Sequence, residues 1–331
     1  MVDPVATESH SVQTRDGWRL GLRRLRASQR PPRGPVLLVH GLGGAGSAFL
    51  MPGRSPAQLL SEAGFDCWVA DLRGRPGSEP PQGKRGRDWD LEDYLDQDLP
   101  ALIDTVLQES GSAQLGWVGH SMGGMLGYAY MIRHAPPTVS CVVSLGGALD
   151  YTHGDSTFRE LAKLRPLLDL LPFVPVGAFG QLSALLLGIL PARVERFSFH
   201  PRNLERAMAR RYFASTMCNV SCAELRNLCS VVERGGLSDR KAERFYASEA
   251  QQFSSPLLAI AGDDDQQCDL RDARATFEGV ASTDKTFLGV GQRFGHQAPY
   301  GHEDLLVGRH TLSEVWPKVA DWLARRVRTR I

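Results

Sequence analysis

The pentapeptide Gly119-His120-Ser121-Met122-Gly123 places a serine between a short apolar run, residues 115–118, and a stretch of small residues, 124–129. The apolar run is typical of a buried strand and the small-residue stretch of a helix, so Ser121 is predicted on the turn between them. Glycine at both flanking positions suits a turn too sharp for side chains. Such a turn lifts the serine hydroxyl to where a carbonyl compound can reach it, which favours a nucleophilic serine.

The composition sets the class of protein. The chain has 331 residues, of which 42% are hydrophobic and 23% charged, which suffices for one large core with an insertion. A net charge of +1 favours no nucleic-acid partner. Residues 1–13 are polar and lack the basic and apolar regions of a secretory signal, so we expect a cytoplasmic protein.

The six cysteines show neither a disulfide framework nor paired zinc-ligand spacing. Cys218, Cys222 and Cys229 could share a helix face and hold a metal, but no fourth ligand lies near them in the sequence. We therefore interpret the cysteines as reduced, buried thiols and expect no metal and no cofactor.

Apolar runs at regular intervals predict the fold class. They cover residues 36–39, 65–70, 115–118, 139–145, 256–261 and 285–290. Helical patterns over 55–63, 91–109 and 312–327 alternate with them, and Asp16-Gly17 marks the turn of an antiparallel hairpin before them. This alternation predicts an α/β protein with a mostly parallel sheet covered by helices on both faces.

Residues 151–250 break the alternation, being helical in pattern. We expect residues 1–150 and 251–331 to form the catalytic core and 151–250 a helical cap. The most apolar stretch, residues 167–190, is interrupted by Asp169, Pro172 and Pro175, so no transmembrane span is predicted. It either packs on the core or presents an apolar face to an acyl chain or a lipid surface.

A nucleophilic serine needs a histidine to take its proton and a carboxylate to orient that histidine. Asp265 follows the apolar run 256–261, at the carboxyl end of a predicted strand, where sites on open α/β sheets form. Asp263 and Asp264 are rivals for the role of the acid, and Asp150, after the preceding strand, is a weaker one. We favour Asp265.

His302 lies beyond the last predicted strand, and the residues after it begin a helix that would hold it in place. His296 is the rival base because it belongs to the same loop. We favour His302 as the base.

The oxyanion hole needs two backbone N–H groups aimed at the developing negative charge. One is expected from Met122, directly after the nucleophile, and the other from Leu42 in the glycine-rich turn 40–44. His40 is interpreted as a residue that shapes this turn, and His120 as a packing or hydrogen-bonding residue.

Together these motifs resemble the α/β-hydrolase superfamily, and within it the acid-lipase group. The resemblance is carried by residues 39–44, 65–74, Asp98-Leu99-Pro100-Ala101, Gly262-Asp263-Asp264-Asp265 and Tyr300-Gly301-His302-Glu303-Asp304, in that order along the chain. It implies an α/β-hydrolase fold, a Ser121, Asp265 and His302 triad, and Leu42 and Met122 as oxyanion donors.

One departure and one further similarity bear on the resemblance. The group commonly has glutamine where this chain has Met122, which leaves the backbone donor intact but changes the side chain facing the substrate. The pentapeptide around Ser121, which we call the elbow, and the His302 motif are also similar to those of bacterial polyester synthases. Those enzymes use a cysteine nucleophile, so Ser121 favours hydrolysis over polymerisation.

The sequence thus predicts an enzyme that hydrolyses a hydrophobic carboxylic ester through an acyl-enzyme on Ser121. A thioesterase or acyltransferase with the same three residues is the alternative, because only the acyl donor and acceptor would differ. A catalytically silent hydrolase fold that binds a ligand is the alternative from another class.

Overall fold

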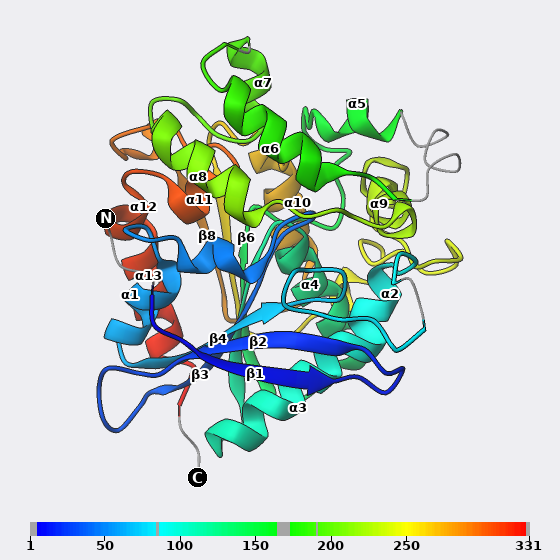
Figure 1. Ribbon diagram of the computed structural model, residues 1–331, viewed down its shortest axis with the longest axis vertical. Coiled ribbons are helices and arrows are strands. Elements are labelled where there is room, and N and C mark those ends of the chain that lie inside the picture. Colours follow the sequence, from blue (N-terminus) through cyan, green and yellow to red (C-terminus); the bar gives the residue numbers. More distant parts are fainter. Residues whose placement is uncertain (1–4, 84–85, 164–172, 190, 329–331) are drawn as a thin grey trace.

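The computed structural model describes residues 5–83, 86–163, 173–189 and 191–328. The strands of the described chain form one sheet in the order β1-β2-β4-β3-β5-β6-β7-β8 (Figure 1). β2 pairs antiparallel with β1 and β4, and every other neighbouring pair is parallel, which confirms the predicted mostly parallel sheet. The strands are β1 (Glu8–Gln13), β2 (Arg19–Leu25), β3 (Gly34–Val39), β4 (Phe65–Asp71), β5 (Leu115–His120), β6 (Val139–Leu145), β7 (Leu257–Gly262) and β8 (Lys285–Val290).

Helices cover both faces of the sheet because its central strands are apolar on both sides. Neighbouring residues of β3 enter opposite cores: Leu37 packs in the cluster with α3 and α4, and Leu38 in the cluster with α1 and α13. The helices of the two layers are α1 (Pro56–Glu62), α3 (Leu99–Ser110), α4 (Met122–His134), α10 (Leu270–Gly279) and α13 (Trp316–Ala324). The predicted double cover is therefore present.

The helix predicted over 91–109 is not continuous. It begins as α2 (Leu91–Asp93), widens into the single π-helical turn η2 (Tyr94–Asp98), and continues as α3. Pro100 has no N–H to donate to the preceding turn, and the Leu99 N–H bonds instead to the Tyr94 carbonyl, five residues back. The proline therefore accounts for the interruption.

The closing helix predicted over 312–327 is also shorter and divided. It consists of α12 (Thr311–Glu314) and α13, separated at Val315, whose φ of −107° lies outside the helical range. Pro317 sits in the first turn of α13, where its missing N–H costs nothing. The proline thus marks the start of a new helix.

The segment between β6 and β7 adds no strand to the sheet in its described residues. It contains α5 (Phe158–Ala162), α6 (Val176–Leu186), α7 (Ala192–Arg196), α8 (Arg206–Thr216), α9 (Cys222–Leu228), η4 (Cys229–Val232) and η5 (Ala250–Gln252). Figure 1 shows α6, α7 and α8 stacked at one end of the sheet. The division into a core and a cap over 151–250 remains a prediction.

The remaining short helices lie in loops: η1 (Gly46–Leu50), η6 (Gln292–Phe294) and α11 (Asp304–Val307). In the part of the chain that the structure describes, no helix is long and apolar enough to cross a bilayer. Residues 167–172 and 190 of the apolar stretch lie outside the described residues.

Cys222 lies in α9, whereas Cys218 precedes that helix and Cys229 begins the η4 turn, so the three thiols do not share one helix. All six cysteines are buried, and none of them forms a disulfide. Among the described residues, no group of three or more His, Cys, Asp or Glu side chains is arranged to hold a metal ion.

Candidate active site

Ser121 occupies the turn between β5 and α4 with a backbone conformation that is rare for a residue with a side chain. Its φ is 54° and its ψ −121°. Backbone hydrogen bonds hold it there: its N–H donates to the Leu145 carbonyl at 2.8 Å, and its carbonyl accepts from Gly124 and Met125. The surrounding backbone thus maintains a strained residue, a condition that clusters at functional sites.

The glycines on either side of Ser121 are required by close packing. A Cβ on Gly119 would lie 2.1 Å from the Gly123 carbonyl oxygen, and one on Gly123 would lie 2.1 Å from the Val39 carbonyl oxygen. Both distances are far shorter than any non-bonded contact allows. The tight turn predicted from the pentapeptide therefore brings β3, β5 and α4 together at Ser121.

His302 and Asp265 form a buried pair. His302 Nδ1 lies 2.8 Å from Asp265 Oδ2, and their side chains are only 2% and 0% exposed. Asp265 follows β7 and His302 precedes α11, so the two meet beyond the carboxyl ends of neighbouring strands. The other oxygen of Asp265 accepts the backbone N–H groups of Gln267 and Cys268, each at 2.9 Å, which orients the carboxylate.

The electrostatics of this pair follow from its burial. Burial lowers the pKa of His302. The charge and hydrogen bond of Asp265 raise it and outweigh burial, so the pKa lies above its ordinary value. The second ring nitrogen, Nε2, is buried and has no hydrogen-bond partner among the described residues. A buried nitrogen without a partner is costly in a folded protein, and it marks the side of the ring available for a reacting group.

Two glycines directly after β6 lie between Ser121 and the pair of His302 and Asp265. A Cβ on Gly146 would lie 3.3 Å from His302 Cε1 and 3.1 Å from Asp265 Oδ2. A Cβ on the next residue, Gly147, would lie 2.7 Å from the Ser121 carbonyl oxygen. Two adjacent glycines therefore separate the serine from the histidine and the aspartate.

His120 ties these two parts of the site together. Its Nε2 lies 3.1 Å from the His302 carbonyl oxygen, and the two rings are 4.8 Å apart. Burial lowers the pKa of His120 well below its ordinary value, so the ring is neutral and its Nε2–H donates to that carbonyl. The residue before Ser121 thus anchors the loop that carries His302.

The glycine-rich turn 41–44 lies directly against the serine. A Cβ on Gly41 would be 3.0 Å from Ser121 Cβ, and the turn closes with a hydrogen bond from Gly44 N–H to the Gly41 carbonyl. Leu42 lies inside this turn, and Met122 is the first residue of α4. Their N–H groups are therefore on the two chain segments that flank Ser121.

His40 connects the glycine-rich turn to the residue that follows β4. Its Nδ1 lies 2.9 Å from the Gly41 carbonyl, and its Nε2 accepts the Leu72 N–H at 3.3 Å. Burial, followed by the charge of Arg75, lowers the pKa of His40 to about 3. The ring is therefore neutral and acts as a hydrogen-bonding spacer, in agreement with the interpretation from the sequence.

The rival acids have other partners. Asp263 accepts the Tyr300 N–H at 3.0 Å, and Asp264 forms an ion pair with Arg196. Asp150 accepts the backbone N–H two residues further on. None of these contacts involves the ring of His302.

The rival base is also engaged elsewhere. His296 Nδ1 accepts the Gly291 N–H at 3.1 Å, and its Nε2 lies 3.1 Å from Lys318 Nζ. The ring of His296 therefore stabilises the loop after β8 through these contacts.

Sequence reasoning missed the contacts of the helical segment 192–216 with the loops that carry Asp265 and His302. The Tyr212 hydroxyl of α8 donates to Glu303 at 2.5 Å, and the Glu303 N–H donates to the Ser198 carbonyl at 2.8 Å. Gln267, two residues after Asp265, donates to the Phe197 carbonyl. The partners in these pairs are about 70 to 105 residues apart along the chain, so no local sequence pattern predicts the contacts.

The glycine-rich turn is held by the residues that follow this segment. The Cys218 N–H donates to the Gly43 carbonyl at 2.6 Å, and Arg75 donates to the Asn219 carbonyl at 2.9 Å. Arg75 in turn forms an ion pair of 2.6 Å with Glu224, and both side chains are fully buried. A buried ion pair thus anchors the connection between α8 and α9, which holds the turn.

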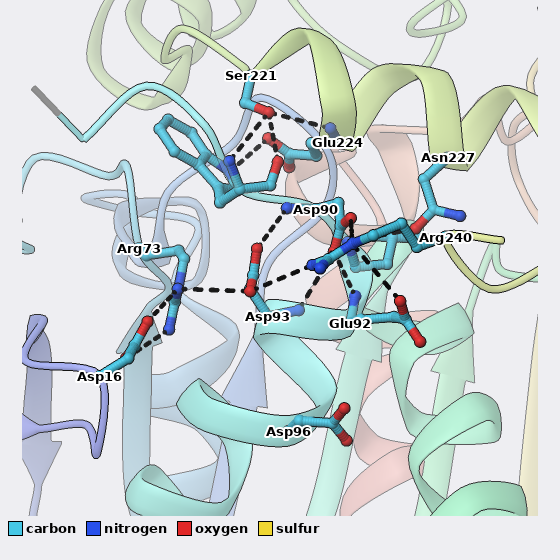
Figure 2. A network of polar contacts seen from close by, with 12 residues as sticks. Asp16, Arg73, Asp90, Glu92, Asp93, Asp96, Ser221, Glu224, Asn227 and Arg240 are labelled. Atoms are coloured by element: carbon cyan, nitrogen blue, oxygen red, sulfur yellow. Dashed lines mark hydrogen bonds and ion pairs between the residues drawn. The ribbon is translucent and has the colours of Figure 1, made fainter.

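A polar network continues from Glu224 across the surface between α2 and α9 (Figure 2). There the Arg240 guanidinium contacts the carboxylates of Asp90, Glu92 and Asp93. A cavity of about 390 Å³ lies beside this network, but its lining includes none of the three residues predicted to be catalytic. The network supports the fold around the site and is separate from it.

Comparisons with known proteins agree with this architecture. The family model of the alpha/beta hydrolase fold matches residues 34–217, more than half of the chain, and that of a partial alpha/beta-hydrolase lipase region matches residues 5–53. Lipase member K of Mus musculus is 31% identical over 133 residues, which cover 37% of this chain and 33% of the relative. Sterol esterase 2 of Saccharomyces cerevisiae is 34% identical over 138 residues, which cover 38% and 26%. The match thus spans a third or less of the length of these relatives.

Solved structures resemble the whole chain at low sequence identity. A soluble variant of monoglyceride lipase from Saccharomyces cerevisiae in complex with a substrate analog superimposes with a TM-score of 0.71 at 18% identity, covering 100% of this chain and 98% of that one. The monoacylglycerol lipase of Paleococcus ferrophilus has a TM-score of 0.62 at 22% identity, covering 92% and 98%. At this identity the likeness establishes a shared fold.

Proposed function

This chain belongs to the α/β-hydrolase fold family, and we propose that it is a carboxylic-ester hydrolase that cleaves hydrophobic esters through an acyl-enzyme on Ser121. The proposal assigns Ser121 as the nucleophile, His302 as the general base and Asp265 as the residue that orients the base. Leu42 and Met122 are assigned as the backbone donors of the oxyanion hole.

One observation carries the assignment. His302 is hydrogen-bonded through Nδ1 to a buried carboxylate, while its Nε2 is buried without a partner next to the segment that contacts Ser121. The Asp265 bond fixes the tautomer with the proton on Nδ1, which leaves a lone pair on Nε2. A lone pair held in this way can accept the proton of a serine hydroxyl.

The reaction then proceeds in two matched halves. Ser121 Oγ attacks the ester carbonyl while its proton moves to His302 Nε2; the tetrahedral intermediate collapses, the C–O bond to the alcohol breaks, and the alkoxide takes the proton from His302. Water repeats the sequence on the acyl-enzyme, releasing the carboxylic acid and restoring Ser121. Asp265 stabilises the imidazolium that forms in each half.

The negative charge of the tetrahedral intermediate develops on the former carbonyl oxygen. Leu42 belongs to the turn that lies against Ser121, and Met122 follows Ser121 at the start of α4, which supports the assignment of their N–H groups to this oxyanion. Because the Gly43 carbonyl accepts the Cys218 N–H, the turn bearing Leu42 is held in place before substrate arrives.

The substrate class is supported by the relatives. Those compared above are named a lipase and a sterol esterase, and another is the gastric triacylglycerol lipase of Bos taurus, which is 31% identical over 134 residues, 37% of this chain and 34% of the relative. These names all refer to esters with large apolar groups. We therefore propose a hydrophobic acyl ester as the substrate.

The test combines turnover with active-site labelling. Wild type should hydrolyse p-nitrophenyl esters of graded chain length and gain one fluorophosphonate adduct by intact mass, localised to Ser121 by peptide mapping. The variant Ser121→Ala should lose both, and Ser140→Ala, which alters another serine at the start of β6, should retain both.

Thioesters and alternative acyl acceptors are measured in the same assay. Faster cleavage of an acyl-thioester than of the matched ester, or preferential transfer to an added alcohol, would replace ester hydrolysis by the corresponding reaction of the same acyl-enzyme. A folded wild type that takes no label would contradict the catalytic assignment altogether.

A further inference from the structure

Helix α6 packs with its small residues inward and its large residues outward. The buried positions are Gly177, Gly180 and Ala184. The exposed positions are Phe179, Leu182 and Leu185, with 66%, 54% and 74% of their surface accessible. This is the reverse of the usual amphipathic helix, in which the large apolar side chains face the core.

The neighbouring helix explains why the small residues lie inside. α6 lies against α8 and the residues that follow it, and a Cβ on Gly180 would come within 2.7 Å of the Met217 side chain. The close approach of the two backbones leaves room only for small residues on that side. Phe179, Leu182 and Leu185, on the opposite side of α6, are therefore left exposed in the described chain.

The exposed apolar surface continues beyond α6. Ile189 is 79% exposed and Val194, on α7, is 47% exposed. Of the six large hydrophobic side chains that are exposed in the described chain, five lie between residues 179 and 194. We call these five, Phe179, Leu182, Leu185, Ile189 and Val194, the α6 patch. Clustering of this kind marks an interaction surface, whereas single exposed hydrophobic residues are ordinary.

The border of the α6 patch is basic. Arg210 of α8 donates to the Ala184 and Leu187 carbonyls at 3.2 and 2.9 Å, which places its guanidinium at the end of α6. Arg206 lies beside the patch as well, since a Cβ on Gly188 would be 3.1 Å from its guanidinium carbon. Two arginines thus flank the large apolar side chains.

Acidic residues neutralise this border only in part: Glu195 forms an ion pair with Arg206, and Asp264 forms one with Arg196 of α7. Residues 173–219 contain six arginines and only two acidic residues. Glu195 is 4% exposed and lies 3.9 Å from Arg206, and Glu205 is engaged by Arg54. The charge presented next to the patch is therefore positive.

We propose that the α6 patch docks this protein onto an anionic lipid bilayer. The large side chains would enter the boundary of the acyl chains, and Arg206 and Arg210 would lie at the level of the headgroup phosphates. An apolar surface bordered by cations matches an anionic bilayer in both respects. Pairing of two copies about a two-fold axis would instead bring like-charged arginines toward each other.

Docking would bring the glycine-rich turn beside Ser121 close to the lipid. The segment that carries the patch also contacts the glycine-rich turn, because a Cβ on Gly43 would lie 3.0 Å from the Val176 side chain at the start of α6. Membrane binding itself does not depend on catalysis. Delivery of substrate from the bilayer rests on the proposed esterase function.

The test is co-flotation of the full chain with vesicles of phosphatidylcholine alone or with about one third phosphatidylglycerol. Wild type should bind the anionic vesicles and lose binding as salt is raised. The double variant Leu182→Asp/Leu185→Asp should bind them at least tenfold more weakly, and Arg206→Gln/Arg210→Gln should lose the preference for anionic lipid. Phe294→Asp removes an exposed phenylalanine outside the patch and should bind as wild type does.

Three results would overturn the proposal: no binding of wild type, equal binding by the patch variants, or a dimer by sedimentation that the leucine variant dissociates. Hydrolysis of a soluble short-chain ester, measured in the same variants, should be unchanged and shows that they are folded. Docking without any hydrolysis would refute the proposed function alone, and hydrolysis without docking would refute the docking proposal alone.

Discussion

The Tyr212 hydroxyl on α8 donates a hydrogen bond of 2.5 Å to Glu303, the residue directly after His302. This bond joins the helical segment between β6 and β7 to the loop that carries the proposed base. It also holds the Glu303 carboxylate in the loop of the imidazole. The charge of Asp265, and after it that of Glu303, raises the pKa of His302. The pH dependence of the reaction should therefore report on this contact.

Replacing Glu303 by Gln should shift the activity profile toward acid. A general base must be unprotonated, so the acid limb of kcat/KM follows the pKa of His302. Removing the negative charge of Glu303 lowers that pKa, and His302 then stays unprotonated at lower pH. The measurement is kcat/KM for a p-nitrophenyl ester as a function of pH.

A matched glutamate serves as the control for this prediction. Glu314 also accepts a tyrosine hydroxyl, that of Tyr300, at 2.8 Å, but does not contribute to the pKa of His302. Glu314→Gln should leave the acid limb in place. A Glu303→Gln profile that superimposes on that of wild type would show that the contact is purely structural.

Asp265→Asn should lower kcat by about 10³ to 10⁴-fold, because an amide can no longer hold the proton on Nδ1 or stabilise the imidazolium. KM should change little, since the side chain is buried behind the histidine. Asp264→Asn, next to it in sequence but paired with Arg196, should retain most of the activity. Steady-state kinetics of the two variants decide the assignment, and equal losses would contradict it.

Gly123→Ala should lower the free energy of unfolding far more than Gly111→Ala does. The new methyl group at residue 123 would lie 2.1 Å from the Val39 carbonyl oxygen, so the backbone of β3 or α4 has to move, at a cost of about 3 kcal/mol or more. At residue 111, φ is +66° but nothing lies within 4 Å, and the cost is that of the left-handed conformation, about 1 kcal/mol. Urea unfolding of both variants compares the two free energies, and similar values would argue against the tight elbow.

Glu224→Ala should destabilise the fold by about 3 to 5 kcal/mol, because it leaves the buried Arg75 guanidinium without its counter-charge. The exposed pair of Lys163 and Glu160 provides the control, and Glu160→Ala should have no measurable effect on unfolding. Since Arg75 also holds the connection between α8 and α9 that contacts Gly43, residual folded Glu224→Ala protein should show a lower kcat. A stable Glu224→Ala protein with full activity would contradict both roles.

Most of the fold and the positions of the candidate residues could be predicted because they depend on local patterns. Apolar runs of four to seven residues predict strands buried on both faces, and Gly119 and Gly123 predict the turn that presents Ser121. Loops after parallel strands must open at one edge of the sheet, which brings Asp265 and His302 near that serine. The helix boundaries at Pro100 and Pro317 were less predictable, because a proline either starts a helix or distorts one depending on the turn before it.

By itself the sequence determined the order of strands and helices, the elbow around Ser121 and the loops that hold Asp265 and His302, because each follows from the spacing of residues close together in the chain. Only the tertiary structure decided which aspartate meets the histidine, that Tyr212 reaches Glu303, and that α6 turns Phe179 and Leu185 outward. These depend on which segments, distant in sequence, pack against each other. The apolar composition of α6 is the same whether its large side chains face a core or a surface, and the close contact with α8 settles which of the two occurs.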